Sequence, residues 1–171
     1  MASDTVRELD AATEHTLGEL EHHGLEKLAN NRLRIVVATT DVHEHSKMLL
    51  ERLFVRMGIG VIDGGVSVDP RDLAQIAERT DAHAIALSTY NGVALTYYGM
   101  LRDELTEMGI DIPVLVGGQL NEIPQDSEDS LPVDVGDELD QLGAVVCRTI
   151  PDAMPWLIEL TETHQSSRAT V

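Results

Sequence analysis

Residues 33–46 read LRIVVATTDVHEHS, an apolar run followed by a polar segment that contains histidine. The run 33–38 is rich in β-branched residues and too short for an ordinary helix, so it predicts a buried strand. The polar residues 39–46 predict a loop at the carboxyl end of that strand. Beyond this loop, apolar side chains recur at helical spacing over 47–57 and Gly58 ends the pattern, which predicts a helix.

The same alternation of short apolar runs and amphipathic segments continues toward the carboxyl terminus. Further strands are predicted at 59–62, 84–87, 112–116 and 144–147. Helices are predicted from Asp69-Pro70, over 95–108, and from Pro151 onward with a core face of Met154, Trp156, Leu157 and Leu160. Because strands that alternate with helices favour a parallel sheet covered on both faces, we expect an α/β, flavodoxin-like (Rossmann-like) doubly wound fold. Its five-stranded parallel sheet should have the order 2-1-3-4-5.

The patterns divide the chain into three segments. Residues 1–32 are predicted to form an N-terminal helical extension, because leucine and valine recur every three or four positions among acidic residues. Residues 33–163 should form the α/β domain, and residues 164–171 a disordered tail. Within the domain, we expect the acidic stretch 119–137 to be a surface loop and Asp63-Gly64-Gly65 to be a tight turn after the second strand.

The composition is strongly acidic, with 12 Lys and Arg against 30 Asp and Glu and a net charge of −18. This charge argues against a nucleic-acid or anionic-membrane partner, since both surfaces select Lys and Arg. No apolar stretch approaches the ~20 residues that span a bilayer, and the N-terminus lacks the basic-then-apolar pattern of a secretion signal. The single Cys147 excludes an internal disulfide and favours a reducing, cytoplasmic location. An acid-rich, lysine-poor surface keeps proteins soluble in concentrated salt, so we also expect a halophilic source.

In a doubly wound sheet, ligands bind beyond the carboxyl ends of the strands, where the strand order reverses. Three common kinds of site are excluded there. No G-x-G-x-x-G follows the first strand, so a dinucleotide site lacks its phosphate-binding turn, and no G-x-x-x-x-G-K-[ST] is present. A phospho-accepting receiver domain needs an acidic residue at the end of the third strand, where this chain has Ser88.

The loop after the first strand contains the pair Asp41-x-His43. A neutral imidazole nitrogen is a good ligand for a transition metal, and the other ring N–H needs an acceptor that fixes the tautomer. Residues two apart in an extended chain point the same way, so the carboxylate of Asp41 is expected to reach the ring of His43. The pair is therefore compatible with a metal site that has one protein ligand. From this spacing alone, a surface Asp and His without a partner is the favoured interpretation, because the D-x-H pattern is common.

Three motifs, taken together, resemble the cobalamin-binding domain family: Asp41-Val42-His43 after the first strand, Ser88 at the end of the third, and Gly117-Gly118 after the fourth. The family pattern is D-x-H-x-x-G, S-x-L and G-G, as in methionine synthase, methylmalonyl-CoA mutase and the small subunit of glutamate mutase. The resemblance covers most of the predicted domain. Ser46 stands at the glycine of the first motif and Tyr90 at the leucine of the second. By their motif positions, both are expected to contact the cofactor.

The resemblance implies a cobalamin cofactor and a role for each motif. His43 would replace the cobalamin's own dimethylbenzimidazole as the lower axial ligand of cobalt, and Asp41 would bond to the other ring nitrogen. The displaced nucleotide tail would lie in a slot beside the sheet. There Ser88 would hydrogen-bond the base of the tail, and Gly117 and Gly118 would leave room for it because they lack Cβ atoms.

The resemblance further implies a cobalamin-binding subunit of an adenosylcobalamin-dependent carbon-skeleton mutase, of the methylmalonyl-CoA or glutamate (methylaspartate) type. Such isomerases hold the substrate in a β/α-barrel on another chain or domain, so this subunit would be inactive alone and would need a large catalytic partner. Assembly of this chain into a homo-oligomer is a further possibility. The short extension 1–32 favours a mutase with adenosylcobalamin over a corrinoid protein of a methyl-transfer system, which carries a helical cap and uses methylcobalamin. There are two alternatives. One is the corrinoid protein of a methyl-transfer system, and the other, suggested by Ser46, is a diverged regulatory or scaffold homologue without cobalamin.

Overall fold

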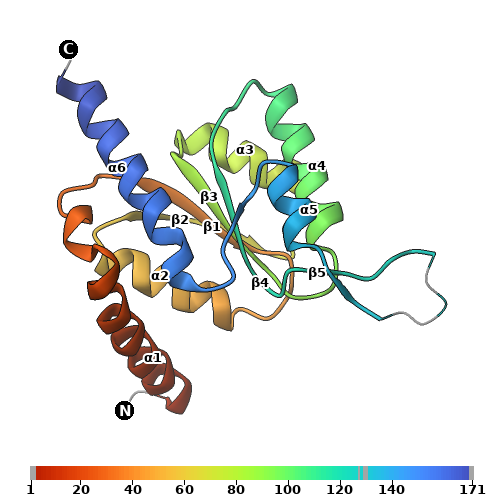
Figure 1. Cartoon of the computed structure of the whole chain (residues 1–171), viewed down its shortest axis with the longest axis horizontal. Helices are drawn as coiled ribbons and strands as arrows, with labels where there is room; N and C mark the ends of the chain where they lie inside the picture. The colour runs from red at the N-terminus through yellow and green to blue at the C-terminus, as the bar shows by residue number, and fades with distance from the viewer. Residues whose placement is uncertain (1–2, 127, 129–130, 170–171) are drawn as a thin grey trace.

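The computed structural model describes residues 3–126, 128 and 131–169. Its centre is a five-stranded parallel sheet in the order β2-β1-β3-β4-β7, which confirms the predicted flavodoxin-like order (Figure 1). The strands of this sheet are β1 (Arg34–Thr39), β2 (Gly60–Val66), β3 (Ala84–Thr89), β4 (Val114–Gly118) and β7 (Val145–Val146). The α-helices are α1 (Asp4–Leu20), α2 (His45–Arg56), α3 (Pro70–Thr80), α4 (Ala94–Glu107), α5 (Gly136–Gln141) and α6 (Met154–Ala169). Short 3₁₀ helices are η1 (Glu21–His23), η2 (Leu25–Leu28) and η3 (Ile150–Ala153).

Helices cover both faces of the sheet (Figure 1). Ile35 and Val37 of β1 belong to the core formed with α1, α2 and α6, whereas Val36 and Ala38 belong to the core formed with α3, α4 and α5. All four are fully buried, because a central strand of a parallel sheet has no solvent face. The β-branched run that predicted this strand therefore contributes side chains to the hydrophobic cores on both faces of the sheet.

Helix α1 is the predicted N-terminal extension, and it packs against α2. Leu20, at its end, is fully buried in the core that α2 and α6 share. On the outer side, ion pairs join Arg52 of α2 to Asp10 and Arg56 to Glu14. The extension is thus part of the layer that covers one face of the sheet.

Strand β2 continues through Asp63-Gly64-Gly65, the segment that we expected to be a turn. Gly64 permits this because a Cβ there would come within 2.7 Å of Val36 and 2.8 Å of Ala38 on the neighbouring strand. The pairing of β1 with β2 shifts register between Val37 and Ala38, a bulge that accommodates the extra residue. Strands β3 and β4 also end later than predicted, so Ser88, Gly117 and Gly118 are strand residues at the carboxyl edge.

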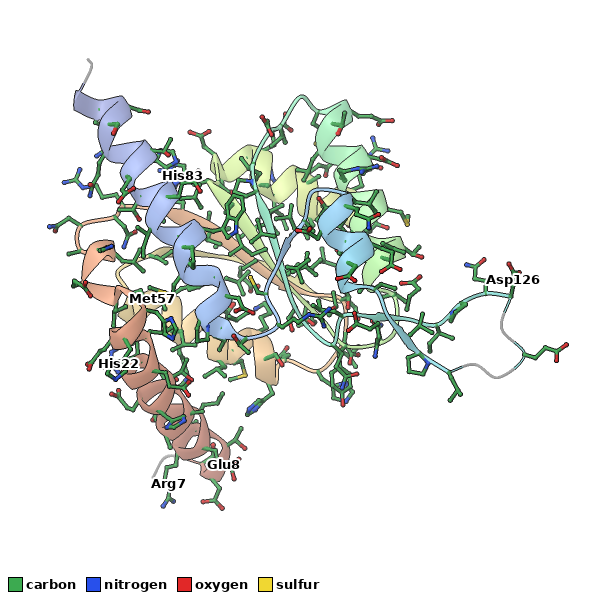
Figure 2. The ribbon with its side chains drawn as sticks, viewed as in Figure 1. Arg7, Glu8, His22, Met57, His83 and Asp126 are labelled. Atoms are coloured by element: carbon green, nitrogen blue, oxygen red, sulfur yellow. The ribbon has the colours of Figure 1, made fainter. Side chains whose placement is uncertain are left out.

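The stretch 119–137 contains regular structure where we expected an irregular loop. The strands β5 (Asn121–Glu122) and β6 (Val133–Asp134) pair as an antiparallel hairpin, and α5 follows. This arm projects from the carboxyl edge of the sheet, with Asp126 far out along it (Figures 1 and 2). Its base is anchored by Glu122, which accepts hydrogen bonds from backbone N–H groups at the start of α4, and by the ion pair of Asp134 with Arg148.

Helix α6 extends to Ala169, so most of the segment 164–171 is helical where we expected a disordered tail; residues 170–171 lie outside the described residues. Met154 and Leu157 carry the packing of this helix, with 1% of each exposed. Trp156, which we placed on the same core face, is 42% exposed. Within the described part of the chain, no helix is long and apolar enough to cross a membrane.

Candidate functional site

The loop between β1 and α2 carries the predicted Asp-x-His pair and is held to the sheet edge by backbone bonds. The N–H of Thr40 donates to the carbonyl oxygen of Ser88 in β3 (3.0 Å), and the N–H of Ser67 donates to the carbonyl oxygen of Asp41 (3.2 Å). The N–H of Asp41 donates to Oγ1 of Thr39 (3.2 Å). These bonds connect the loop with β3 and with the residue that follows β2, so the sheet edge fixes the position of the loop.

Asp41 holds His43 through the contact expected from their spacing. Nδ1 of His43 lies 2.8 Å from Oδ2 of Asp41, and the N–H of Val42 donates to Oδ1 (2.6 Å). The bond from His43, and then that from Val42, lowers the pKa of Asp41 against the opposing effect of burial. Because an ionised carboxylate only accepts hydrogen bonds, Nδ1 carries the proton and Nε2 of the neutral ring keeps its lone pair. The side chain of His43 is 75% exposed, so a ligand can reach this ring.

Tyr90 follows β3 directly and lies against the histidine. Its ring centroid is 5.9 Å from that of His43, and the two ring planes are tilted by 51°. Tyr90 is 53% exposed, so this contact is made at the surface of the site. The predicted residues Asp41, His43 and Tyr90 therefore form one connected group.

A cavity of about 250 Å³ lies between the sheet, α2 and α6. Its apolar lining comes from side chains of both helices and of β4, including Leu49, Phe54, Leu115, Met154 and Leu157. Polar groups are contributed by His45 and Ser46 at the start of α2, Ser88 of β3, and Arg148 and Thr149 after β7. Such a cavity suits a flat apolar group that carries a few polar atoms.

Ser88 is the buried polar residue of this cavity. It is 4% exposed, it lines the cavity, and none of the described residues forms a hydrogen bond with its hydroxyl. A ligand in this cavity could therefore form a hydrogen bond with the hydroxyl. Gly118, at φ +85°, brings the end of β4 against β3, where a Cβ would collide with the carbonyl oxygen of Thr89. Gly117 also lines the cavity, and a Cβ there would lie 3.2 Å from the carbonyl oxygen of Cys147.

The segment after β7 adds a thiol and a guanidinium that we did not predict as site residues. Burial, and then the charge of Asp152, raises the pKa of Cys147 to about 11, so its thiol stays protonated at neutral pH. Arg148 donates two hydrogen bonds to Asp134 (2.8 and 2.9 Å), and this pairing lowers the pKa of Asp134 to about 2. Arg148 thereby joins the base of the arm to the cavity wall.

Lys47, in the first turn of α2, anchors the start of this helix through two ion pairs. Its ammonium nitrogen lies 2.6 Å from Oε1 of Glu51 and 2.8 Å from Oδ1 of Asp63 in β2. Burial opposes the charged form, but the two carboxylates outweigh it and raise the pKa of Lys47. This buried cation joins the helix that begins with His45 and Ser46 to the neighbouring strand.

The structure brings the predicted site residues together in two neighbouring groups. The first group, Asp41, His43 and Tyr90, lies at the loop, and the second, Ser46, Ser88, Gly117 and Gly118, lines the cavity. The bond between Thr40 and Ser88 connects them. Sequence reasoning missed the lining from α6, because no motif marks apolar residues that meet only in the folded chain.

These features define a class of protein: a doubly wound α/β domain with a single-tautomer imidazole at the switch point and an apolar cavity beside it. Among the described residues, no three His, Cys, Asp or Glu side chains are grouped to hold a metal ion. A metal bound through His43 would therefore bring its other ligands with it, as in an organic metal complex. The cavity offers space for a further part of such a complex.

The sequence model of the B12 binding domain matches residues 31–146, and the chain belongs to this family. It is 30% identical over 124 residues to the methylmalonyl-CoA mutase large subunit of Propionibacterium freudenreichii, a match that covers 71% of this chain and 17% of that protein. It is 31% identical over 91 residues to glutamate mutase sigma subunit 2 of Haloarcula marismortui, covering 53% of this chain and 61% of that subunit. The chain thus spans less than two thirds of each of these relatives.

Two solved structures share the fold. A cobalamin-binding protein from Desulfitobacterium hafniense superposes with a TM-score of 0.53 at 21% identity, over 80% of this chain and 59% of that one. The methanol:cobalamin methyltransferase complex from Methanosarcina barkeri gives a TM-score of 0.55 at 17% identity, over 81% of this chain and 47% of that one. At these identities the likeness concerns the fold alone.

Proposed function

We propose that this chain holds cobalamin with His43 as an axial ligand of cobalt and with the nucleotide tail in the cavity between the sheet, α2 and α6. The carrying observation is the bond of Nδ1 of His43 to Asp41, because it leaves Nε2 as the free donor atom. Membership of the B12 binding domain family supports cobalamin as the group.

The cavity supports the placement of the tail. A benzimidazole is flat and apolar, which suits the lining by Leu49, Phe54 and Leu157, and its ring nitrogen is an acceptor that the unpaired hydroxyl of Ser88 could satisfy. Gly118 contributes by letting β4 end close to β3 beside this hydroxyl. The residues present therefore fit the base of the tail.

The residues of this chain bind and orient the cofactor rather than perform the chemistry. When bound, cobalamin supplies a reactive cobalt–carbon bond. Asp41 accepts a hydrogen bond from the Nδ1–H of His43, which raises the basicity of Nε2 toward a metal. The apolar lining would shield the nucleotide tail from water. Ser46, in the first turn of α2, lines the cavity.

For the biological role, we propose the cobalamin-carrying subunit of an adenosylcobalamin-dependent carbon-skeleton mutase, acting on methylmalonyl-CoA or glutamate together with a large catalytic subunit. The named relatives are a mutase large subunit and a glutamate mutase sigma subunit, which supports a mutase over the alternatives. A corrinoid carrier for methyl transfer is the second candidate, since the fold also superposes on a methyltransferase complex.

The binding proposal is tested by loading the purified chain with hydroxocobalamin and removing free cofactor by gel filtration. We expect retained cobalamin with a base-off spectrum, and imidazole nitrogen coupling in the EPR spectrum of the Co(II) form. His43→Ala should abolish this coupling, while His15→Ala, on the exposed face of α1, should keep it. If the wild-type chain retains no cobalamin under conditions in which it is folded, the proposal is wrong. The result would then favour the alternative of a regulatory or scaffold homologue without cobalamin.

The cavity is tested separately by filling it. Ala86 is a buried cavity residue of β3, so Ala86→Phe should fill the space and reduce cobalamin retention by at least about tenfold, at a packing cost of about 1–3 kcal/mol. Circular dichroism checks that the variant is folded. As a second readout, alkylation of Cys147 by iodoacetamide should be slow in the free protein and slower still once cobalamin is bound. Unchanged alkylation with cobalamin retained would place the tail elsewhere.

The mutase role is tested by mixing the loaded chain with a candidate catalytic subunit from the same organism. Isomerisation of methylmalonyl-CoA or glutamate that depends on both chains supports the proposal. Methyl transfer from the loaded chain to a partner methyltransferase, without isomerisation, would establish the corrinoid carrier instead.

A further inference from the structure

The hydrogen bond to Asp41 does not by itself fix the orientation of the His43 ring. One bond places Nδ1, but the ring can still turn about its own side-chain torsion while that bond survives. A metal ligand must hold its donor atom within about 10–20° of the required direction. A second contact, away from the bond to Asp41, is needed to set the plane of the ring.

Tyr90 provides such a contact. The centroid separation of 5.9 Å lies within the range of aromatic pairs, about 4.5–7 Å, and the tilt of 51° is intermediate between stacked and edge-to-face. With 75% of the His43 side chain exposed, its surroundings restrict the ring only weakly. The phenol ring therefore limits the movement that Asp41 leaves free.

Asn91 connects the two loops that carry these rings. The hydroxyl of Thr40 donates to Oδ1 of Asn91 (3.0 Å), and Nδ2 of Asn91 donates to the carbonyl oxygen of Thr40 (3.3 Å). Thr40 directly precedes Asp41, and Asn91 directly follows Tyr90. This reciprocal pair keeps the carboxylate that orients the imidazole and the phenol ring at a constant separation.

We propose that Tyr90 and Asn91 are positioning residues for the metal-binding imidazole: Tyr90 sets the ring plane of His43, and Asn91 keeps the two loops in register. The inference rests on the proposed function for the identity of the metal, but the ring contact and the loop bonds belong to the free protein. Tyr90 thus has a role toward the histidine ring that an aliphatic side chain at this position would not perform in the same way.

The free protein allows a test that needs no cobalamin. In a histidine-labelled sample, Tyr90→Ala should shift the ring proton signals of His43, because the ring current is lost, and broaden them, because the ring becomes mobile. Tyr90→Phe keeps the aromatic ring and should retain both the shift and the line width. Asn91→Ala should move the same signals in the direction of Tyr90→Ala, and Asn91→Asp, which keeps the acceptor for Thr40, should have a smaller effect.

The loaded protein gives the functional readout. Tyr90→Ala should lower the ratio of histidine-ligated to unligated Co(II) cobalamin about 2- to 10-fold, the range expected for loss of one aromatic pair. Tyr90→Phe should restore it. The nitrogen coupling in the EPR spectrum measures this ratio directly, and a merely structural role for Tyr90 would not change it in a folded protein.

The outcomes separate this inference from the proposed function. If Tyr90→Ala leaves the His43 signals and the nitrogen coupling as in the wild type, the positioning role is wrong even though cobalamin binding stands. If the wild-type chain binds no cobalamin but Tyr90→Ala still frees the His43 ring, the contact is real and the proposed function fails.

Discussion

Asp41 shows how several weak constraints converge on one residue. Its carbonyl oxygen accepts from Ser67, its N–H donates to Thr39, and its carboxylate accepts from both Val42 and His43. The carboxylate is therefore in place before any ligand arrives, and its bond to Nδ1 of His43 needs no reorganisation on binding. The lowered pKa of Asp41 means that this arrangement persists down to pH values below 3.8, the ordinary pKa of the group.

Replacing Asp41 by Asn keeps the size of the side chain and removes its charge. We expect Asp41→Asn to lower the affinity for cobalamin, and the histidine-ligated fraction, by about 10- to 100-fold, because a neutral amide increases the basicity of the imidazole less than a carboxylate does. Spectroscopic titration with hydroxocobalamin measures this effect. Asp111→Asn, an exposed residue at the opposite edge of the sheet, is the matched control. Equal affinity for Asp41→Asn and wild type would remove Asp41 from the site.

At the scale of elements, the sequence predicted a helix start correctly where the contacts that stabilise it lie between neighbouring residues. A helix was predicted to begin at Asp69-Pro70, and α3 does so: the Asp69 side chain accepts a hydrogen bond from the N–H of Arg71, with Pro70 at the first helical position. The hairpin arm was missed because its anchors, Glu122 at the start of α4 and Asp134 with Arg148, join segments that lie far apart in the sequence. Trp156 was misplaced because helical spacing does not show which side of α6 meets the sheet.

Helix α6 is also joined to the sheet by a pair of histidines. His83, directly before β3, lies beside α6 with its ring centroid 3.9 Å from that of His164 (Figure 2). Its Nδ1 accepts a hydrogen bond from the N–H of Arg34 (2.9 Å). Burial, followed by the electrostatic effects of His164 and Arg34, lowers the pKa of His83, with Arg168 acting in the same direction and Asp81 in the opposite one. The neutral form is therefore favoured in the folded protein.

This lowered pKa predicts a loss of stability in mild acid. Above pH 6.5, the ordinary pKa of the group, His83 is neutral in both states and contributes no pH dependence. Below it, the unfolded chain binds a proton that the folded chain resists, so the free energy of unfolding falls until the pH reaches the folded pKa. His83→Asn keeps an acceptor for Arg34 and cannot titrate, so chemical denaturation between pH 7 and 5 should show a weaker pH dependence, by at most one proton. The exposed control His22→Asn should behave like wild type; an unchanged slope in His83→Asn would contradict the prediction.

At the scale of the whole molecule, the charge of −18 opposes the compact state through self-repulsion. Exposed ion pairs such as Arg52–Asp10 and Arg56–Glu14 relieve this repulsion locally between α1 and α2. The fold itself does not depend on this charge, because both cores are formed by apolar residues of the sheet and the helices.

Salt should therefore stabilise the protein. Screening shortens from about 8 Å at 0.15 M salt to about 3 Å at 1 M, so repulsion among the acidic side chains weakens more than the few exposed ion pairs do. We expect the Tm to rise by roughly 5 °C between 0.15 and 1 M KCl, measured by differential scanning calorimetry. An uncharged osmolyte at equal osmolality is the control for solvent exclusion. A Tm that falls over this range would show that attractive pairs outweigh the repulsion.

The sequence by itself determined the layered α/β architecture, the strand order and the residues of the Asp41–His43 pair, since buried strands, helix starts and a two-residue spacing are properties of short segments. Only the tertiary structure decided that Ser88 meets a cavity walled by α2 and α6, and that Tyr90 and Asn91 lie against the loop of His43. The physical reason is that these contacts join segments far apart in the chain. Packing and the crossover connections between parallel strands decide which segments meet, and no local sequence pattern contains that information.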